Sequence, residues 1–357
     1  MNEKNFFPYD GDLNWQSDIR KIYAKINDKV SKDIFTNRVL FSCTNDFSFL
    51  RKVIDLTETG QSFSQKLLLL NQQNGKFIIY GAGIRGTRLN LMYPEINWTG
   101  YIDKYKAGTL NDLPIFPRKE ISPHKDTYII ISPELDNDSI IKDLKRAGFT
   151  DTNIIPLESY EHQLMEKQYF EKRCLKKHDL SSFVDIGCYN GMDSIHFKKW
   201  STQTTPYIYA FEPDHRNYVE CQRSLNTIVN TAIFNMGLAD KQGTMSVTSD
   251  GYASNLITQQ KATTERTIKI STLDLELSDK KIDYIKMDVE GMELPIIHGA
   301  KHIIQTQKPY MAISVYHKRE DIVALPAAVL DICDDYTFAF GHYDMTAADT
   351  VLYAIPK

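Results

Sequence analysis

The stretch Phe183-Val184-Asp185-Ile186-Gly187-Cys188-Tyr189-Asn190-Gly191-Met192-Asp193-Ser194 decides the fold of this chain. It begins with a short, mostly apolar run of the kind that forms a buried strand, two glycines follow, and we predict a helix for residues 192–200. In a strand–turn–helix of this kind, backbone N–H groups approach a polar ligand, and glycine is needed where a Cβ would block the turn or the approach. The stretch therefore predicts a ligand-binding loop at the edge of an α/β sheet.

The second half of this signal lies in the next predicted strand, residues 207–211, which is followed by Glu212 and Pro213. A carboxylate at the tip of the second strand is placed to accept hydrogen bonds from a ribose diol. Together, the glycine loop and Glu212 predict a site for an adenosine-type cofactor.

Strands and helices alternate through the rest of the C-terminal half. We predict helices at residues 215–229, 292–305 and 320–333, main strands at 231–236, 281–288 and 310–316, a closing pair at 337–340 and 350–355, and β segments at 243–249 and 267–271 that flank a polar loop. This alternation predicts a parallel sheet covered on both faces, with ligands at the carboxyl ends of its strands. Those ends carry Asp185, Glu212, Gly237, Asp288, Glu290, Tyr316 and His317.

A second glycine motif lies in the N-terminal half. The run Gly81-Ala82-Gly83-Ile84-Arg85-Gly86 follows a predicted strand at residues 76–80, and the next strand, 98–102, ends on Asp103. This is the dinucleotide-binding pattern with its acid in place, so Gly81, Gly83, Gly86 and Asp103 form a second predicted nucleotide site. A strand at 127–132, a helix at 138–148 and a strand at 153–155 complete a small unit. Nucleotide or nucleotide-sugar binding and a purely structural or dimerising role both remain open for it.

We predict four segments along the chain. Residues 1–74 form a helical N-terminal segment, 75–157 a Rossmann-like nucleotide-binding unit, 158–180 a helical linker and 181–357 the larger α/β domain. Apolar residues at three- and four-residue spacing, from Trp15 to Ile26, predict an amphipathic first helix. This segment is interpreted as a preface packed on the next domain, with a partner-binding cap as the alternative.

The composition excludes several classes of protein. The 357 residues carry a net charge of −4 with acids and bases interspersed, which argues against a nucleic-acid-binding protein. The five cysteines are scattered and include no C-x-x-C pair, so neither a disulfide framework nor a zinc knuckle is indicated. The N-terminus lacks a secretory pattern, and no apolar run is long enough to cross a bilayer. We therefore expect a soluble, cytoplasmic protein.

Three motifs carry a family resemblance. Val184-Asp185-Ile186-Gly187 with Gly191, then Phe211-Glu212-Pro213, then Lys286-Met287-Asp288-Val289-Glu290-Gly291-Met292-Glu293 resemble the FkbM family of S-adenosylmethionine-dependent methyltransferases. The resemblance extends from about residue 181 to the C-terminus. It implies a class I methyltransferase fold, a Rossmann-like, seven-stranded, mostly parallel sheet with an antiparallel closing strand. The loop departs from the common methyltransferase pattern, because Tyr189 replaces its middle glycine and Cys188 the usual alanine.

The resemblance also implies S-adenosylmethionine as cofactor and suggests roles along the strand ends. Asp185 is expected to reach the amino-acid part of the cofactor, Glu212 the ribose hydroxyls, and Gly237 or Asp240 the adenine. The full set of expected cofactor-binding residues is Asp185, Gly187, Cys188, Tyr189, Gly191, Ser194, Glu212, Pro213, Gly237 and Asp240.

The catalytic residues are expected at the ends of later strands. Asp288 points toward the methyl group and its acceptor, and the candidates for a general base are Asp288, Glu290, His317 and His342. His317 is the first choice because a neutral imidazole accepts a proton near pH 7; the alternative is that it bonds a loop carbonyl.

We expect no metal, although a divalent ion at Asp288 and Glu290 remains an alternative. His298 and His302 have the i, i+4 spacing of a metal pair but lack the H-E-x-x-H context. Ser254 and Asn255 lie in a polar loop that either covers the acceptor site or is plain surface.

The sequence therefore predicts an S-adenosylmethionine-dependent methyltransferase that modifies a hydroxyl of a saccharide or related polyhydroxylated compound. The partner is a small-molecule or glycan acceptor, with a nucleotide-linked sugar and a homo-oligomer both left open. One alternative is an NAD-dependent oxidoreductase that uses residues 81–86, where Asp103 favours NAD over NADP, although no Tyr-x-x-x-Lys segment follows. Another is a non-catalytic nucleotide-sugar-binding protein in which Tyr189 blocks the cofactor.

Overall fold

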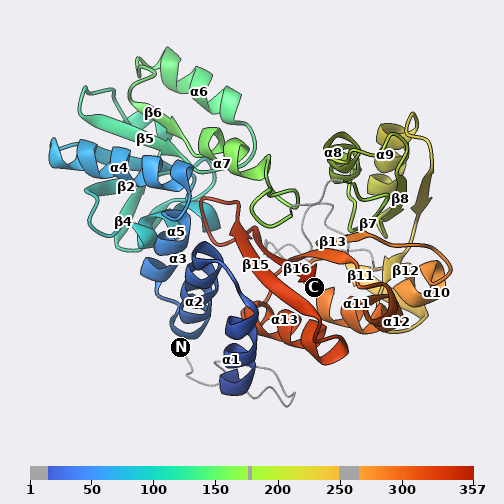
Figure 1. Ribbon diagram of the computed structural model, residues 1–357. Helices are drawn as coiled ribbons and strands as arrows, with labels where there is room; N and C mark the ends of the chain where they lie inside the picture. Colours follow the sequence, from blue (N-terminus) through green and yellow to red (C-terminus); the bar gives the residue numbers. More distant parts are fainter. Residues whose placement is uncertain (1–14, 176–178, 249–264) are drawn as a thin grey trace. The chain divides into compact units, whose positions relative to one another are not determined.

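A computed structural model describes residues 15–175, 179–248 and 265–357 of the chain (Figure 1). These residues form two compact units. The C-terminal unit contains the described residues of 1–35, 169–341 and 349–357, and the N-terminal unit contains residues 36–168 and 342–348. The grouping differs from the four segments predicted from the sequence, because residues 15–35 belong to the C-terminal unit and residues 342–348 to the N-terminal one.

The N-terminal unit is built on a six-stranded sheet in the order β3-β4-β2-β1-β5-β6. Its strands are β1 (Lys76–Tyr80), β2 (Trp98–Ile102), β3 (Gly108–Leu110), β4 (Leu113–Phe116), β5 (Thr127–Ile131) and β6 (Ile154–Pro156). The central strand β1 pairs in parallel with β2 and β5, and only the edge strand β3 pairs antiparallel among these strands. The glycine motif that follows β1 therefore lies at the carboxyl edge of three adjacent parallel strands.

The helices of this unit are α3 (Phe47–Ile54), α4 (Glu58–Gln72), α5 (Ile84–Met92), α6 (Asn137–Arg146) and α7 (Glu158–Met165), with a 3₁₀ turn at Arg118–Glu120. Side chains cap the first turns of α3 and α4. The side chain of Asp46 accepts a hydrogen bond from the Ser48 N–H at the start of α3.

Two features of the N-terminal unit were missed from the sequence. The hairpin β3–β4 turns at Asn111 and Asp112, which both have left-handed backbone angles (φ 48° and 61°) of the kind that tight hairpins require. The helix predicted for residues 158–180 ends at Met165. Tyr169 and Phe170, which follow, are buried in the C-terminal unit, and Tyr169 itself is left-handed (φ 64°), which is incompatible with a continuous helix.

The C-terminal unit contains a seven-stranded sheet in the order β15-β16-β14-β13-β7-β8-β9. Its strands are β7 (Ser182–Ile186), β8 (Tyr207–Phe211), β9 (Thr231–Phe234), β13 (Tyr284–Met287), β14 (Tyr310–Ser314), β15 (Tyr336–His342) and β16 (Thr350–Pro356). Strands β14, β13, β7, β8 and β9 pair in parallel, and β16 pairs antiparallel with β14. The predicted parallel α/β sheet with an antiparallel closing strand is confirmed.

A second, three-stranded sheet in the same unit has the order β10-β12-β11. Its strands are β10 (Gly237–Leu238), β11 (Gly243–Thr248) and β12 (Glu265–Ser271). Gly237 therefore belongs to this small sheet, where it pairs with Ile270, and does not end the third main strand.

The helices of the C-terminal unit are α1 (Trp15–Lys25), α8 (Met192–Trp200), α9 (His215–Leu225), α10 (Leu273–Leu277), α11 (Glu293–Gly299), α12 (Lys301–Gln307) and α13 (Asp321–Ile332), and α2 (Lys29–Thr44) contributes residues to both units. The single helix predicted for residues 292–305 is thus two helices. The break follows Gly299, where a Cβ would lie 2.0 Å from the carbonyl oxygen of Ala239. Within the described residues, no helix is long and apolar enough to span a membrane.

Candidate active site

The glycine loop after β7 packs directly against the loop after β13. A Cβ on Gly187, whose φ is +76°, would lie 1.9 Å from the carbonyl oxygen of Asp288. Gly191 is also left-handed (φ +83°), and it precedes the first residue of α8. Both glycines are therefore required by the backbone path and by packing, before any ligand is considered.

Tyr189, between these glycines, has the left-handed backbone that glycine adopts most easily. Its φ is 48°, and 40% of its surface is exposed. Its N–H donates to Glu212 Oε2 at 2.9 Å, while the Asp214 N–H donates to Glu212 Oε1 at 2.8 Å. Tyr189 thus keeps the turn that a glycine would make, at a conformational cost of about 1–3 kcal/mol.

The Glu212 carboxylate is buried at the tip of β8. Burial raises the pKa of Glu212, and hydrogen bonds from the two backbone N–H groups and the Asn217 side chain offset this only in part. A carboxylate has about four lone-pair sites, so the group can still accept a ligand hydroxyl.

Asp185 lies entirely in the interior. The Ser194 hydroxyl donates to its Oδ2 at 2.7 Å, and Lys286 Nζ lies 3.2 Å from its Oδ1. Lys286 also lies 3.3 Å from Asp193 Oδ2 and donates to the Gly187 carbonyl at 2.8 Å. Asp185 and Ser194 therefore support the loop from beneath through Lys286, which sequence analysis did not assign a role.

The other expected cofactor residues lie in three different surroundings. Cys188 turns into a small core and its sulfur lies 3.3 Å from that of Cys221, away from the exposed face of the loop. Pro213 and Gly237 come together, since a Cβ on Gly237 would lie 3.8 Å from the Pro213 Cβ. Asp240 is exposed after β10.

The three expected catalytic residues meet at the carboxyl ends of β13 and β14. His317 Nε2 lies 3.3 Å from Asp288 Oδ1 and 3.7 Å from Glu290 Oε2. The other ring nitrogen, Nδ1, lies 2.8 Å from Oε1 of Glu293 at the start of α11. Glu293 was missed as a site residue, although it belongs to the D-V-E-G-x-E motif that carried the resemblance.

The surroundings of His317 favour the imidazolium. Burial lowers the pKa of His317, but Glu293, then Asp288 and Glu290, outweigh it and raise the pKa to about 9. His317 therefore carries its proton near pH 7 in this structure, which differs from the neutral imidazole on which the prediction of a general base relied.

Asp288 is also held by tyrosines. The Tyr169 hydroxyl donates to Asp288 Oδ2 at 2.6 Å, and the Tyr316 hydroxyl lies 3.5 Å from Oδ1. Tyr169 is buried, and its carbonyl accepts the Tyr284 hydroxyl. Nothing in the charged segment around Tyr169 indicated this contact, because it links residues 119 positions apart in the chain.

The remaining histidines do not form the arrangements considered from the sequence. His298 and His302 are exposed and lie on the separate helices α11 and α12, so the spacing of a metal pair on one helix is lost. His342 belongs to the N-terminal unit. Ser254 and Asn255 lie outside the described residues.

The glycines of the N-terminal motif differ in what surrounds them. A Cβ on Gly81 (φ +102°) would lie 2.8 Å from Ser132 Oγ, and one on Gly86 would lie 2.1 Å from the Gly81 carbonyl oxygen. A Cβ on Gly83 would meet nothing within 4 Å. Gly81 and Gly86 are thus explained by packing, whereas Gly83 is not.

Asp103, the acid of this motif, binds its own backbone. Its Oδ2 accepts the Ala82 N–H at 2.9 Å, and its Oδ1 accepts the N–H groups of Tyr105 and Lys106 at 2.8 and 3.0 Å. Three backbone donors therefore already use the carboxylate that the dinucleotide-binding pattern reserves for a ribose.

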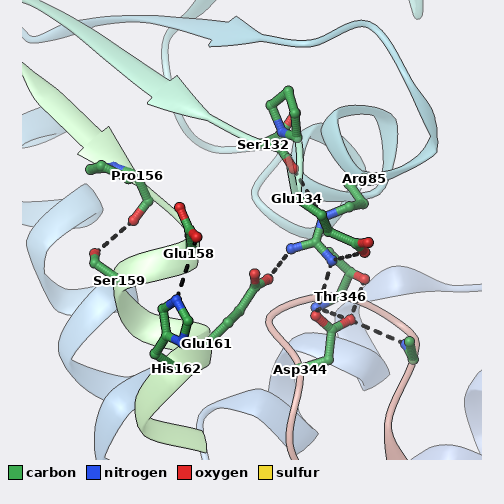
Figure 2. A network of polar contacts seen from close by, with 12 residues as sticks. Arg85, Ser132, Glu134, Pro156, Glu158, Ser159, Glu161, His162, Asp344 and Thr346 are labelled. Atoms are coloured by element: carbon green, nitrogen blue, oxygen red, sulfur yellow. Dashed lines mark hydrogen bonds and ion pairs between the residues drawn. The ribbon is translucent and has the colours of Figure 1, made fainter. Parts of the chain in front are cut away.

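Arg85, inside the motif, is the centre of a buried ionic network (Figure 2). Its guanidinium contacts Glu161 and lies 2.8 Å from Glu134 and 3.4 Å from Asp344, and its Nε donates to the Ser132 carbonyl at 2.9 Å. Burial acts to raise the pKa of Asp344, but Arg85 and a hydrogen bond from Thr346 hold it at about 2. Arg85 thus ties the glycine motif to residues 342–348 of the same unit.

Comparisons with known proteins find similarities that centre on the C-terminal unit. Residues 185–340 match the methyltransferase FkbM domain. The 2-O-methyltransferase NoeI of Sinorhizobium fredii is 25% identical in an alignment of 175 residues, and the match covers 43% of this chain and 71% of that protein. The crystal structure of methyltransferase FkbM from Methylobacillus flagellatus covers 91% of this chain and 99% of its own, with a TM-score of 0.51 and 17% identity.

The family match supports the methyltransferase domain that the sequence motifs predicted, over residues 185–340. Its range contains Glu212, the glycine loop and the cluster around His317, and it does not contain Tyr169. The Gly81–Gly86 motif also lies outside the matched residues, so the nucleotide site of the N-terminal unit stays a prediction.

Proposed function

We propose that this protein transfers a methyl group from S-adenosylmethionine to a hydroxyl oxygen of a saccharide or related polyhydroxylated compound. The observation that carries the proposal is the order of groups along one sheet edge. Glu212 follows β8, the glycine loop follows β7, and Asp288 and Glu290 follow β13. A ribose-binding acid and a polar acceptor site on either side of a glycine loop suit a methyl donor held between them. The 25% identical 2-O-methyltransferase supports a hydroxyl acceptor.

The donor chemistry of the loop fits the cofactor. Glu212 keeps free lone pairs toward ligand hydroxyls, and the exposed Tyr189 ring offers an apolar surface beside it. S-adenosylmethionine supplies an electrophilic methyl group on a sulfonium sulfur. Lys286 supports the loop through its ion pair with Asp185 and its hydrogen bond to the Gly187 carbonyl.

Glu290 is the residue best placed to take the acceptor's proton. It is the most exposed carboxylate next to His317, with 43% of its side chain accessible, and burial raises its pKa above the ordinary value. A base whose pKa lies closer to neutrality is more effective, and general-base help is worth about 10²–10⁴-fold. With the cofactor bound, a Glu290 carboxylate oxygen would take the proton of the acceptor hydroxyl as its oxygen receives the methyl group. Asp288 and the His317 imidazolium orient this carboxylate and the acceptor.

The first test is binding of S-adenosylhomocysteine measured by thermal shift and calorimetry. At about 100 times Kd, binding adds about 2.7 kcal/mol to the stability of the folded state. We expect this stabilisation in wild type and in Asp103→Ala, the matched acid of the N-terminal unit, and its loss in Glu212→Ala. Stabilisation that survives Glu212→Ala, or that is absent from wild type, contradicts the proposal.

The second test is transfer of labelled methyl groups to a panel of saccharides and polyols. Glu290→Gln should lower kcat by about 10²–10⁴-fold while S-adenosylhomocysteine still binds. An active Glu290→Gln enzyme would assign the proton to another group.

A nucleotide-linked ligand in the N-terminal unit is a second proposal, supported by Gly83. This glycine faces open space, whereas packing requires Gly81 and Gly86, so close approach of a phosphate is a reason for its lack of a side chain. UDP-sugars, GDP-sugars and NAD would be screened against wild type and Gly83→Asp. A ligand lost in Gly83→Asp but kept in Glu212→Ala assigns the site. NAD bound there, without S-adenosylhomocysteine elsewhere, would favour the oxidoreductase alternative.

A further inference from the structure

The cluster around His317 contains more negative than positive charge. Asp288, Glu290 and Glu293 all lie within 3.7 Å of one imidazole ring. Even as an imidazolium, His317 offsets one of the three carboxylates. Buried carboxylates in a polypeptide are normally paired with cations or bind a metal ion.

Two of these side chains are buried with polar atoms left over. The Glu293 side chain is 1% exposed, and its Oε2 has no hydrogen-bond partner among the residues that the structure describes. The His317 side chain is 8% exposed, and neither ring nitrogen makes a well-directed hydrogen bond within that part of the chain, despite its close carboxylate neighbours. Both side chains therefore have unused bonding capacity inside the cluster.

Asp288, Glu293 and His317 lie close enough together for one ion to be reached by a ligand atom from each. Ligands at about 2.1 Å from a divalent cation are about 3.0 Å apart in octahedral geometry and about 3.4 Å apart in tetrahedral geometry. The 2.8 Å contact with Glu293 is made by His317 Nδ1, and the 3.3 Å contact with Asp288 is made by Nε2. One imidazole binds an ion through one of these nitrogens, so the carboxylate beside the other nitrogen has to turn toward the ion. Ligands of one ion also approach each other off the axis of the ring nitrogen, which matches short contacts that are poor hydrogen bonds. One ligand atom from each of the three residues lies within 4.8 Å of the others.

We propose that Asp288, Glu293 and His317 bind one divalent cation, and that this cation holds the acceptor hydroxyl; the second part rests on the proposed methyl transfer. An imidazole with two carboxylates suits a first-row transition metal such as Mn²⁺ or Zn²⁺ better than Mg²⁺. On binding, the cation takes the place of the imidazole proton, which leaves to solvent. Asp288 and Glu290 are the more exposed members of the cluster, so open coordination positions for an acceptor oxygen lie beside Glu290.

The site is tested on the full chain after chelator treatment, with Mn²⁺ as the probe in calorimetry and electron paramagnetic resonance. We expect one saturable site in wild type, and affinity at least 10-fold lower in Glu293→Gln and in His317→Gln. The control is His302→Gln, an exposed histidine on α12, which should bind as wild type does. Co²⁺ should give visible absorption bands that shift when His317 is replaced.

Each outcome bears on the proposal. No saturable Mn²⁺ or Zn²⁺ binding in wild type overturns it, as does binding that both cluster variants retain. If a variant fails to fold, Asp288→Asn provides the same affinity test at a less buried ligand. S-adenosylhomocysteine binding is measured in parallel. If it binds but no cation does, only the cation site is contradicted. If a cation binds but S-adenosylhomocysteine does not, only the proposed methyl transfer is contradicted.

Discussion

The two glycine loops of this protein are alike in the strand that precedes them and in the acid after one neighbouring strand, and they differ in the strand on the other side. Each follows a central parallel strand, β1 or β7, and each gives one N–H to the acid after the neighbouring strand. The Ala82 N–H donates to Asp103 at 2.9 Å, and the Tyr189 N–H donates to Glu212 at 2.9 Å. The shared geometry explains why both stretches carry the same sequence signature.

The difference lies in the strand on the other side of each loop. In the N-terminal unit, Arg85 of the motif contacts Ser132 and Glu134, which follow β5. The polar groups at the end of β5 are therefore used by contacts within the protein. In the C-terminal unit, the cation is Lys286 within β13, beneath the loop, and β13 continues into Asp288 and Glu290 above it. A glycine loop thus provides a place for a ligand, whereas the next strand determines whether reactive groups face it.

The largest expected effect is the loss of stability when Gly187, in the loop of the C-terminal unit, is replaced by alanine. Gly187→Ala should cost more than about 3 kcal/mol in the free energy of unfolding, because its Cβ would overlap the Asp288 backbone and its φ of +76° disfavours alanine. The measurement is urea denaturation, together with hydrogen exchange of β7 and β13. Gly243→Ala is the matched control, since its Cβ would meet nothing within 4 Å. Equal stability of the two variants would contradict the packing argument.

The next effect tests the contacts of Arg85 in the N-terminal unit. Arg85→Ala would leave Glu161 and Asp344 buried without their partner, and breaking a buried ion pair costs about 3–5 kcal/mol. Hydrogen exchange of β1 and α5 would report the loss. Arg146→Ala, which removes an exposed pair with Asp143, should change stability by less than about 1 kcal/mol. S-adenosylhomocysteine binding should persist in Arg85→Ala. Loss of binding would mean that the two glycine loops do not act independently.

Local sequence patterns predicted the parts of each loop that depend on neighbours in the chain. The strands, Gly187, Gly191 and the acids Glu212 and Asp103 were all placed at strand ends by periodicity and glycine spacing. The partners that hold these loops were not predicted. The Tyr169–Asp288 bond joins residues far apart in sequence, and a single lysine in an apolar strand does not reveal which carboxylate it meets. Tertiary pairing of this kind leaves no periodic signal.

A smaller effect follows from a buried histidine of the N-terminal unit. Burial, and then the charge of Arg38, lower the pKa of His342 to about 4, although Asp344 acts in the opposite direction. The unfolded chain has the ordinary value of about 6.5, so it binds a proton first as the pH falls, and folding is destabilised. From pH 7 to pH 5 the folded state should lose about 2 kcal/mol of stability because of His342. This stability is fully present only above about pH 6.5.

The measurement is the difference in unfolding free energy between wild type and His342→Gln at the two pH values. The difference isolates His342, because the pH-dependent contribution of Glu161, whose pKa burial and Asp344 raise to about 8, has the opposite sign and is the same in both proteins. His124→Gln, at an exposed position, should show no such change. If the difference in unfolding free energy between wild type and His342→Gln is the same at pH 7 and pH 5, His342 is not a buried neutral imidazole.

The smallest expected effect is at Gly83. Its φ of −91° and ψ of −170° are open to any residue, and its Cβ would face open space, so Gly83→Ala loses only the slight preference for glycine at a helix N-cap. The lower entropy of the unfolded chain offsets that loss, and the net change should be within about 0.5 kcal/mol. A variant this neutral separates folding from binding. If a nucleotide-sugar binds Gly83→Ala more weakly than wild type, the absence of a side chain at Gly83 serves ligand binding. If the two affinities are the same, ligand binding does not require a glycine at this position.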